Sequence, residues 1–548
     1  MATFRCNYTQ LSGSRGVPLF NRSLNADFAL AHAMPRLARL ISSHRTIAFV
    51  VAIVLPLVSG WLVALTMPRG PVTAPQALSL MLVGLGVGFL VGFILQSRWA
   101  MALAPLVHVV AFEIGRIGVF GPTVSAIRVD NAYAILALIL GRGFFAIADI
   151  APMLLGAYFG ATVMRRSEMM TARRFDKVVR WGPSVLASFA LLALAALILI
   201  PASTPPILGT DGQTVPGSIA ELSIVRLGGH DQTVMIRAHR KDKPVLLYLS
   251  GGPGQSDLPY ARVLFDDLSK SFIVVGWDQR GAGKSYGAIE PIATLTPEQA
   301  VADTNELTDY LCRRFNKRKI YLLGESWGSI LGVLAVKRRP ELYFAFIGSG
   351  QMVSPRETDR RIYRDELDLA ARSGDGAFAN TLRAFGEPPY ADVPYGNAFA
   401  MGHYEQLYKP YTPPHAYIER GTQARIGPFG VLGSEYNFIE KLNVLRGLLD
   451  TFSIMYPKLQ NIDFRRDVKR LEVPVYLLDG EAEIRSRRSL ALEWFGNLKA
   501  PIKRRFAFEN AGHSVVFEQF QPFDKIMREI IVPETYSSAP RPPTSNRK

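Results

Sequence analysis

The stretch Lys319-Ile320-Tyr321-Leu322-Leu323-Gly324-Glu325-Ser326-Trp327-Gly328-Ser329 decides the fold of the second half of this 548-residue chain. An apolar run leads directly into Gly-x-Ser-x-Gly, and the segment from Trp327 to Lys337 that follows is apolar with few helix breakers. This pattern is typical of a nucleophile elbow, where small neighbours let a serine occupy a tight turn between a strand and a helix. Ser326 is therefore the candidate nucleophile. The backbone amide of Trp327, at the expected helix start, is a candidate oxyanion donor.

A glycine-rich turn lies upstream of the elbow. Ser250-Gly251-Gly252-Pro253-Gly254 follows the apolar run Val245 to Leu249. Because Gly251 and Gly252 have no β-carbon, a backbone N–H of this turn can approach a substrate carbonyl closely. The amide of Gly252 is thus the second candidate oxyanion donor, with Gly251 in support. A plain β-turn is the alternative interpretation.

A third motif, Trp277-Asp278-Gln279-Arg280-Gly281-Ala282-Gly283-Lys284-Ser285, follows an expected strand at residues 272–275. Asp278 and Arg280 are two residues apart and are followed by spaced glycines. The pattern favours a buried ion pair between them that ties the strand end to the glycine-rich turn. We therefore expect both residues to support the site without taking part in its chemistry.

Candidates for a general base and its acid lie near the carboxyl terminus. His513, in Glu509-Asn510-Ala511-Gly512-His513-Ser514, follows an expected strand and fits the chain order serine, acid, histidine. Three carboxylates follow the expected strand at residues 473–478, in Asp479-Gly480-Glu481-Ala482-Glu483. We predict Glu483 as the acid because, in folds that carry the chain order serine, acid, histidine, the acid lies on a short loop a few residues beyond the strand. Asp479 is the alternative.

Together these motifs closely resemble the prolyl iminopeptidase branch of the α/β-hydrolases, over roughly residues 220–532. The resemblance implies an eight-stranded, mostly parallel sheet with a helical cap inserted before the acid strand. It also implies a serine hydrolase that frees the N-terminal residue of a short peptide. The family normally carries aspartate where Glu483 stands. Relatives with these motifs include esterases and amidases, so the resemblance specifies the mechanism better than the substrate.

The expected cap also follows from chain length. More than a hundred residues separate the apolar run at 344–348 from the strand at 473, too many for a single connection. We therefore predict a cap at about residues 352–468. The resemblance implies that cap carboxylates hold the substrate amine. The candidates are Glu405, Glu419, Glu435 and Glu440, and the alternative for each is an ordinary solvated helix charge.

The first half of the chain is of a different kind. Five long apolar segments precede Pro201, and an α-helix needs about 20 apolar residues to cross a bilayer. They are residues 46–68, 76–97, 99–120, 133–164 and 182–201. We predict an all-α transmembrane bundle over residues 46–201. The third and fourth segments carry the ionisable residues His108, Glu113, Arg116, Arg142 and Asp149. We expect these groups to pair within the bundle, and a proton or substrate pathway is the alternative.

The distribution of charge predicts the orientation of the bundle. Residues 1–45 hold six arginines against one aspartate, and residues 165–180 hold six basic side chains against two acidic ones. Basic segments face the cytoplasm. Five spans place both segments there, with the first span as an uncleaved signal anchor. The hydrolase, residues 202–532, is then extracytoplasmic on the plasma (inner) membrane.

Composition excludes several other functions. Residues 1–200 carry 17 basic and six acidic side chains, so +11 of the formal charge of +16 belongs to the membrane region, which argues against nucleic-acid binding. Cys6 and Cys312 are expected on opposite sides of the membrane and therefore unpaired. Histidine spacing and the absence of a nucleotide loop predict no metal and no cofactor. Residues 533–548 are predicted to be a disordered tail, and the oligomeric state is left open.

Three functions fit these patterns. The first is a membrane-anchored aminopeptidase acting on short peptides, and the second is an esterase or lipase acting on acyl esters. The third is a non-catalytic sensor module, for which the unusual Glu483 is the support. A reactive Ser326 separates the first two from the third.

Overall fold

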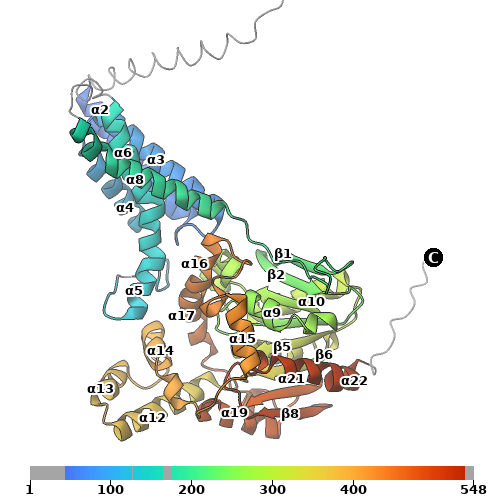
Figure 1. Ribbon diagram of the computed structural model, residues 1–548. Coiled ribbons are helices and arrows are strands. Elements are labelled where there is room, and N and C mark those ends of the chain that lie inside the picture. The colour runs from blue at the N-terminus through green and yellow to red at the C-terminus, as the bar shows by residue number, and fades with distance from the viewer. Residues whose placement is uncertain (1–43, 126, 164–173, 537–548) are drawn as a thin grey trace, which may run out of the picture.

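The computed structural model describes residues 44–125, 127–163 and 174–536, which form a helical unit followed by an α/β unit (Figure 1). The predicted basic segment at residues 1–45 and most of the basic loop at 165–180 lie outside the described residues, as does the tail from residue 537. The described chain continues past the predicted domain end at residue 532, through helix α22 (Val532–Thr535). Residues 533–535 are therefore helical and do not belong to a disordered tail.

Each of the five apolar segments forms helix. The elements are α2 (Arg45–Thr66), α3 (Ala74–Leu95), α4 (Ala100–Gly115), α5 (Ala132–Leu138), the π-turns η1 (Ile139–Gly143) and η2 (Ala146–Ile150), α6 (Ala151–Val163) and α8 (Arg174–Leu199). By length and composition, four stretches suit a membrane span: α2, α3, the continuous run from α5 through α6, and residues 181–199 of α8. Helix α4 is apolar but shorter. The five-span arrangement stays a prediction.

Helices α3 and α6 approach closely because glycines recur every fourth residue along both. A β-carbon added at Gly88 or Gly92 would collide with a backbone carbonyl of α6. A β-carbon at Gly156 or Gly160 would in turn collide with a carbonyl of α3. Small residues at this spacing let helix backbones touch, which is the usual way helices associate in lipid.

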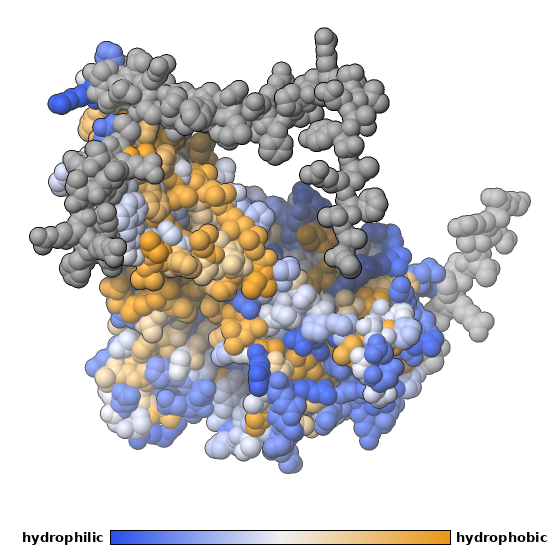
Figure 2. Space-filling model, turned by 45° about the horizontal axis from the view of Figure 1, so that its top comes forward, coloured by the Kyte–Doolittle hydropathy of each residue, from blue (hydrophilic) through white to orange (hydrophobic). Residues whose placement is uncertain are grey.

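The charged residues of the bundle pair with one another, as expected. Glu113 accepts hydrogen bonds from Arg116 and from Arg142. Asp149 lies 2.6 Å from Nε2 of His108, and both of these side chains are fully buried. Arg142 and Arg116 therefore share the carboxylate of Glu113. Large apolar side chains instead face outward, and Figure 2 shows an apolar surface over the helical unit beside a mostly hydrophilic α/β unit.

The α/β unit contains the predicted eight-stranded sheet. Its strands are β1 (Ile219–Leu227), β2 (His230–Ala238), β3 (Val245–Leu249), β4 (Ile273–Asp278), β5 (Ile320–Glu325), β6 (Tyr343–Ser349), β7 (Val475–Gly480) and β8 (Lys503–Phe508). They lie in the order β1-β2-β4-β3-β5-β6-β7-β8. Strands β1, β2 and β4 pair antiparallel, and all other pairs are parallel. The carboxyl ends of β3 to β8 consequently meet at one edge.

Helices cover both faces of this sheet, since its central strands are apolar on both sides. One buried cluster joins the sheet to α10 (Pro297–Arg314), α11 (Trp327–Arg338) and α19 (Arg485–Asn497). The other joins it to α9 (Leu258–Leu264), α20 (Val515–Glu518) and α21 (Phe520–Ile526).

The predicted cap is the insertion between β6 and β7. It contains α12 (Pro355–Ser373), α13 (Gly376–Phe385), α14 (Val393–Met401), α15 (His415–Ala424), α16 (Phe438–Arg446), the π-turn η9 (Gly447–Thr451), α17 (Phe452–Met455) and α18 (Phe464–Asp467). In Figure 1, α5 reaches from the helical unit towards α14, and α16 lies below the bundle. The ring of Tyr133 packs edge-on against that of Tyr395, with 5.4 Å between centroids. The cap thus contacts the helical unit directly.

Candidate functional site

Ser326 sits on a strained turn between β5 and α11. Its backbone has φ 54° and ψ −118°, a conformation that residues other than glycine rarely adopt. The flanking glycines leave no space for side chains, because a β-carbon at Gly324 would collide with the carbonyl oxygen of Gly328, and one at Gly328 with that of Leu249. These contacts hold the serine half-buried at the carboxyl edge of the sheet. This is the elbow geometry that the sequence predicts.

His513 is bonded to Glu483. Its Nδ1 shares a short hydrogen bond with Oε2 of Glu483, which is 6% exposed. The other carboxylate oxygen accepts from the amide of Ile484 at 2.8 Å and from Nη1 of Arg487 at 3.1 Å. Burial opposes ionisation of Glu483, but His513, Arg487 and these hydrogen bonds outweigh it and lower its pKa to about 2. Glu483 is therefore an anion that orients the imidazole.

The alternative acid, Asp479, is turned away from the histidine. Arg488 donates two hydrogen bonds of 2.9 Å to its carboxylate, and Arg505 donates a third at 3.3 Å. Gly350 packs against the imidazole, since a β-carbon at this position would lie 3.0 Å from the ring of His513. Of the carboxylates considered in this loop, the structure brings Glu483 to His513.

The glycine-rich turn lies against the serine. A β-carbon added at Gly251 would be 3.2 Å from Cβ of Ser326. Gly252 has φ 104°, which only glycine adopts without strain. The turn thus occupies the position that the sequence predicts for it, next to the amino end of α11.

Gln279 ties this turn to α11, and sequence reasoning missed it. Its Nε2 donates to the carbonyl oxygen of Ser250 at 3.1 Å, and its Oε1 accepts from Nε1 of Trp327 at 3.0 Å. In the sequence, Gln279 is an uncharged residue between the charged Asp278 and Arg280, to which the motif drew attention. The signal that could have found it is its place directly after the end of β4, beside the glycine-rich turn that follows β3.

The predicted ion pair between Asp278 and Arg280 is wrong. Arg280 pairs with Asp303 of α10 at 3.0 Å. Asp278 accepts hydrogen bonds from Ser256 and from the amide of Lys284, and burial raises its pKa to about 7. The two side chains diverge because β4 ends at Asp278, so the alternation of faces along the strand does not extend to Arg280. Both remain structural residues, each with another partner.

A second buried acid, Glu325, lies directly before Ser326. Its Oε1 accepts from Ser514 at 2.9 Å, and its Oε2 lies 3.3 Å from the hydroxyl of Tyr248, which is also 2.9 Å from Asp257. A phenol has one proton to give, so both contacts of Tyr248 are satisfied only when one of the two acids is protonated. Burial and the nearby Asp257 raise the pKa of Glu325 to about 7. The network therefore joins the residue before Ser326 to the residue after His513 and holds an extra proton.

The raised pKa predicts a pH-dependent stability. Below the ordinary pKa of 4.5, Glu325 is neutral both folded and unfolded; between 4.5 and about 7 only the unfolded chain ionises, so stability falls as pH rises. Glu325→Gln copies the neutral form and should remove this loss, at most about 3 kcal/mol at about 1.4 kcal/mol per unit. Thermal unfolding in detergent at pH 5.5 and 8.5 measures it. The wild-type midpoint should drop more than that of Glu325→Gln, with exposed Glu529→Gln behaving like wild type. Parallel shifts in all three proteins would refute the assignment.

The four cap glutamates proposed from sequence have other roles. Glu435 pairs with Arg262, Glu440 caps α16 and pairs with Lys284, and Glu405 and Glu419 are exposed. A fifth, Glu366 of α12, is fully buried, and neither of its carboxyl oxygens has a hydrogen-bond partner among the described residues. Burial and Asp365 raise its pKa to about 8. Its spacing with Ile362 and Ala370 on one helix face was the signal in the sequence.

Within residues 44–125, 127–163 and 174–536, no three His, Cys, Asp or Glu side chains are grouped so as to hold a metal ion. Within these ranges, Cys312 is a free thiol, and burial raises its pKa to about 11. Cys6 lies outside the described residues.

Comparisons with known proteins support an α/β-hydrolase fold for the second half of the chain. A family model described as alpha/beta hydrolase fold matches residues 244–388. The probable aminopeptidase YbaC of Bacillus subtilis is 28% identical over 303 residues, covering 55% of this chain and 93% of that protein. The proline iminopeptidase of Lactobacillus helveticus is 33% identical over 108 residues, covering 19% of this chain and 35% of that relative. A proline iminopeptidase-related protein from Thermus thermophilus aligns over 59% of this chain and 100% of its own at 20% identity, with a TM-score of 0.41.

Proposed function

Residues 202–536 have the α/β-hydrolase fold, and on that premise we propose that the chain is a serine hydrolase that releases the N-terminal residue of short peptides. The observation that carries the proposal is the strained Ser326 at the same sheet edge as the His513–Glu483 pair. The names of the relatives, an aminopeptidase and proline iminopeptidases, support a peptide substrate.

In the proposed reaction, His513 takes the proton from Oγ of Ser326 as the oxygen attacks the carbonyl carbon of the scissile amide. The amides of Gly252 and Trp327 stabilise the negative oxygen of the tetrahedral intermediate. His513 then gives its proton to the leaving nitrogen, and the C–N bond breaks. Water attacks the acyl-enzyme by the same route and releases the acid. Glu483 stays ionised throughout and holds the imidazole in one tautomer.

We infer that Glu366 binds the substrate amine. Unlike Glu435 and Glu440, it has no hydrogen-bond partner in the part of the chain that the structure describes, and a buried carboxyl without one is costly unless a ligand supplies it. An incoming ammonium would ionise Glu366 and supply both the charge and the hydrogen bonds that it lacks.

A peptide assay tests substrate and amine site together. The purified full-length protein should hydrolyse dipeptide and tripeptide amides with a free N-terminus and lose at least about 100-fold in kcat/KM when the amine is acetylated, a loss expected when a buried charge is left unpaired. Glu366→Gln should raise KM for free-amine peptides about tenfold or more while leaving labelling of Ser326 by a fluorophosphonate unchanged. Exposed Glu419→Gln is the matched control.

Two results would contradict this substrate. Equal rates on free and acetylated peptides would exclude an exopeptidase that reads the amine. Cleavage of p-nitrophenyl acyl esters with a chain-length preference, without peptide hydrolysis, would indicate an esterase.

We also propose that the helical unit crosses the plasma membrane five times and places the hydrolase outside the cytoplasm. The outward-facing apolar side chains of the bundle and the basic charge of residues 1–45 and 165–180 support this. Intact spheroplasts should then hydrolyse a membrane-impermeant peptide as fast as lysed ones. Activity that appears only after lysis would reverse the orientation.

A further inference from the structure

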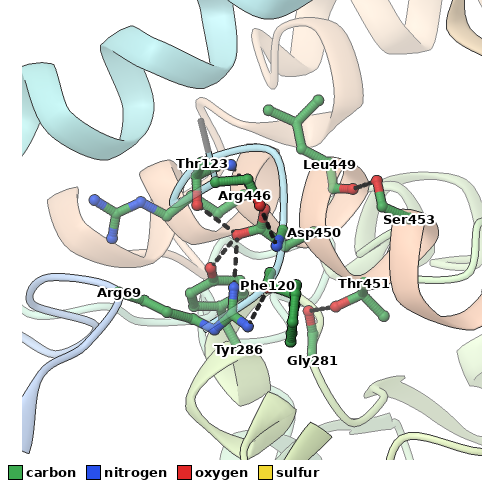
Figure 3. A network of polar contacts seen from close by, with 12 residues as sticks. Arg69, Phe120, Thr123, Gly281, Tyr286, Arg446, Leu449, Asp450, Thr451 and Ser453 are labelled. Atoms are coloured by element: carbon green, nitrogen blue, oxygen red, sulfur yellow. Dashed lines mark hydrogen bonds and ion pairs between the residues drawn. The ribbon is translucent and has the colours of Figure 1, made fainter. Parts of the chain in front are cut away.

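Asp450, on the cap turn η9, is the centre of a buried network that joins three parts of the chain (Figure 3). Its carboxylate is fully buried. It accepts from the amide of Thr123 at 3.0 Å and the hydroxyl of Thr123 at 2.6 Å, from the hydroxyl of Tyr286 at 2.6 Å, and from Nη1 of Arg69 at 3.4 Å. Thr123 and Arg69 belong to the helical unit, and Tyr286 belongs to the hydrolase core.

The buried network around Asp450 continues along the boundary between the cap and the helical unit, which we call the seam. Arg446, fully buried, donates to the carbonyl oxygen of Leu140 at 2.7 Å and to that of Pro71 at 2.9 Å. Within the helical unit, Arg69 also donates to the carbonyl oxygen of Phe120 at 2.6 Å, which ties the segment after α2 to the segment after α4. Buried charges persist only where hydrogen bonds replace water, so both sides must meet in one arrangement. The seam therefore fixes the cap against the helical unit.

The same five-residue turn touches the glycine-rich turn beside Ser326. In the neighbouring turn after β4, the carbonyl oxygen of Gly281 accepts a hydrogen bond of 2.7 Å from the hydroxyl of Thr451. A β-carbon at Gly254 would collide with the carbonyl oxygen of Gly447, so the backbones of η9 and of the glycine-rich turn are in contact. The turn η9 thus contacts the helical unit through Asp450 and the glycine-rich turn through Gly447.

We propose that Asp450 is a positioning residue through which the helical unit holds η9 against the turn Gly251 to Gly254 and so fixes the oxyanion donor of Gly252. The proposal rests on the proposed hydrolase function. It gives the several helices a role beyond attachment, because the partners of Asp450 and Arg446 come from the segments after α2 and α4 and from η1. A single anchoring span would not present all of these groups.

Asp450→Asn in the full-length protein tests the proposal. Asparagine keeps the shape but loses the charge and one acceptor oxygen, so η9 should loosen and the donor of Gly252 should lose its position. We expect kcat for peptide hydrolysis and the second-order rate of fluorophosphonate labelling to fall about tenfold, below the 100- to 1,000-fold cost of deleting an oxyanion donor outright. KM should change less than about twofold, because substrate binding does not need that donor.

Asp392→Asn is the matched control. Asp392 bridges the cap to Arg128 of the helical unit at 2.6 Å, but it lies directly before α14 and not on η9. It should leave kcat and the labelling rate within about twofold of wild type. If Asp450→Asn fails to fold, as judged by gel filtration and thermal unfolding, Thr123→Val replaces it. That variant removes one donor to Asp450 and should lower the labelling rate about threefold.

The outcomes separate this inference from the proposed function. An unchanged kcat and labelling rate in folded Asp450→Asn or Thr123→Val would overturn the inference while wild-type activity upheld the function. A raised KM with unchanged kcat would also overturn it, as would an equal loss in Asp392→Asn. A wild-type protein that neither hydrolyses peptides nor labels would overturn the function and this inference together.

Discussion

Ser326→Ala is expected to abolish hydrolysis and fluorophosphonate labelling, with kcat falling by more than about 1,000-fold. Alanine removes the only atom that can form the acyl-enzyme in the proposed reaction, and the oxyanion donors alone leave a small residual rate. The fold should survive, because the side chain of Ser326 is half-buried and the strained backbone is set by Gly324 and Gly328. Labelling and peptide hydrolysis by the purified, detergent-solubilised protein measure the effect.

Ser373→Ala is the control for this variant, since Ser373 is an exposed serine at the end of α12. It should hydrolyse and label like wild type. If Ser326→Ala kept wild-type hydrolysis in a preparation free of other hydrolases, Ser326 would not be the nucleophile. If the wild-type protein were folded yet never labelled, the α/β unit would act as a non-catalytic module.

The second large effect is expected at Glu483. Glu483→Gln should lower kcat by roughly 1,000- to 10,000-fold, because the amide neither stabilises the imidazolium nor holds the required tautomer. Glu483→Asp keeps the charge for His513 and for Arg487 and should retain intermediate activity. Kinetics per mole of folded protein are needed, since Glu483→Gln leaves Arg487 buried without its anion.

Asp479→Asn distinguishes the two acids of this loop. Asp479 is bonded to Arg488 and Arg505 and not to His513, so its loss should lower the unfolding temperature while kcat per folded molecule stays within about threefold. A collapse of kcat in Asp479→Asn, with Glu483→Gln active, would transfer the acid role to Asp479.

The pairing of Glu483 with His513 could be predicted from local sequence, whereas the partner of Arg280 could not. Both residues lie a few positions beyond a strand, and parallel strands bring such positions to one edge. Their meeting could therefore be expected from the order of strands and loops. The partner of Arg280 could not, because Asp303 lies on α10 and reaches Arg280 only through the packing of that helix on the sheet.

The same distinction separates the two kinds of acid in the cap. Glu435 and Glu440 are conspicuous in the sequence, but each forms an ion pair within the protein, Glu435 with Arg262 and Glu440 with Lys284. Glu366 reads as one charge on a charged helix, and only the packing of α12 buries it without a partner. Whether a carboxylate is free to bind a ligand depends on its neighbours in space, which the spacing along one helix does not specify.

The sequence by itself determined the elbow at Ser326 and the helical character of the apolar segments, because each depends on local periodicity and on short turns. The length of the insertion required a cap, and the eight-stranded sheet was implied by the resemblance to the prolyl iminopeptidase branch. Only the tertiary structure decided the seam in which Asp450 meets Arg69, whose positions differ by 381 residues. Contacts at such separation arise when whole units pack together. They are selected by the desolvation of particular charges, and no local pattern encodes that choice.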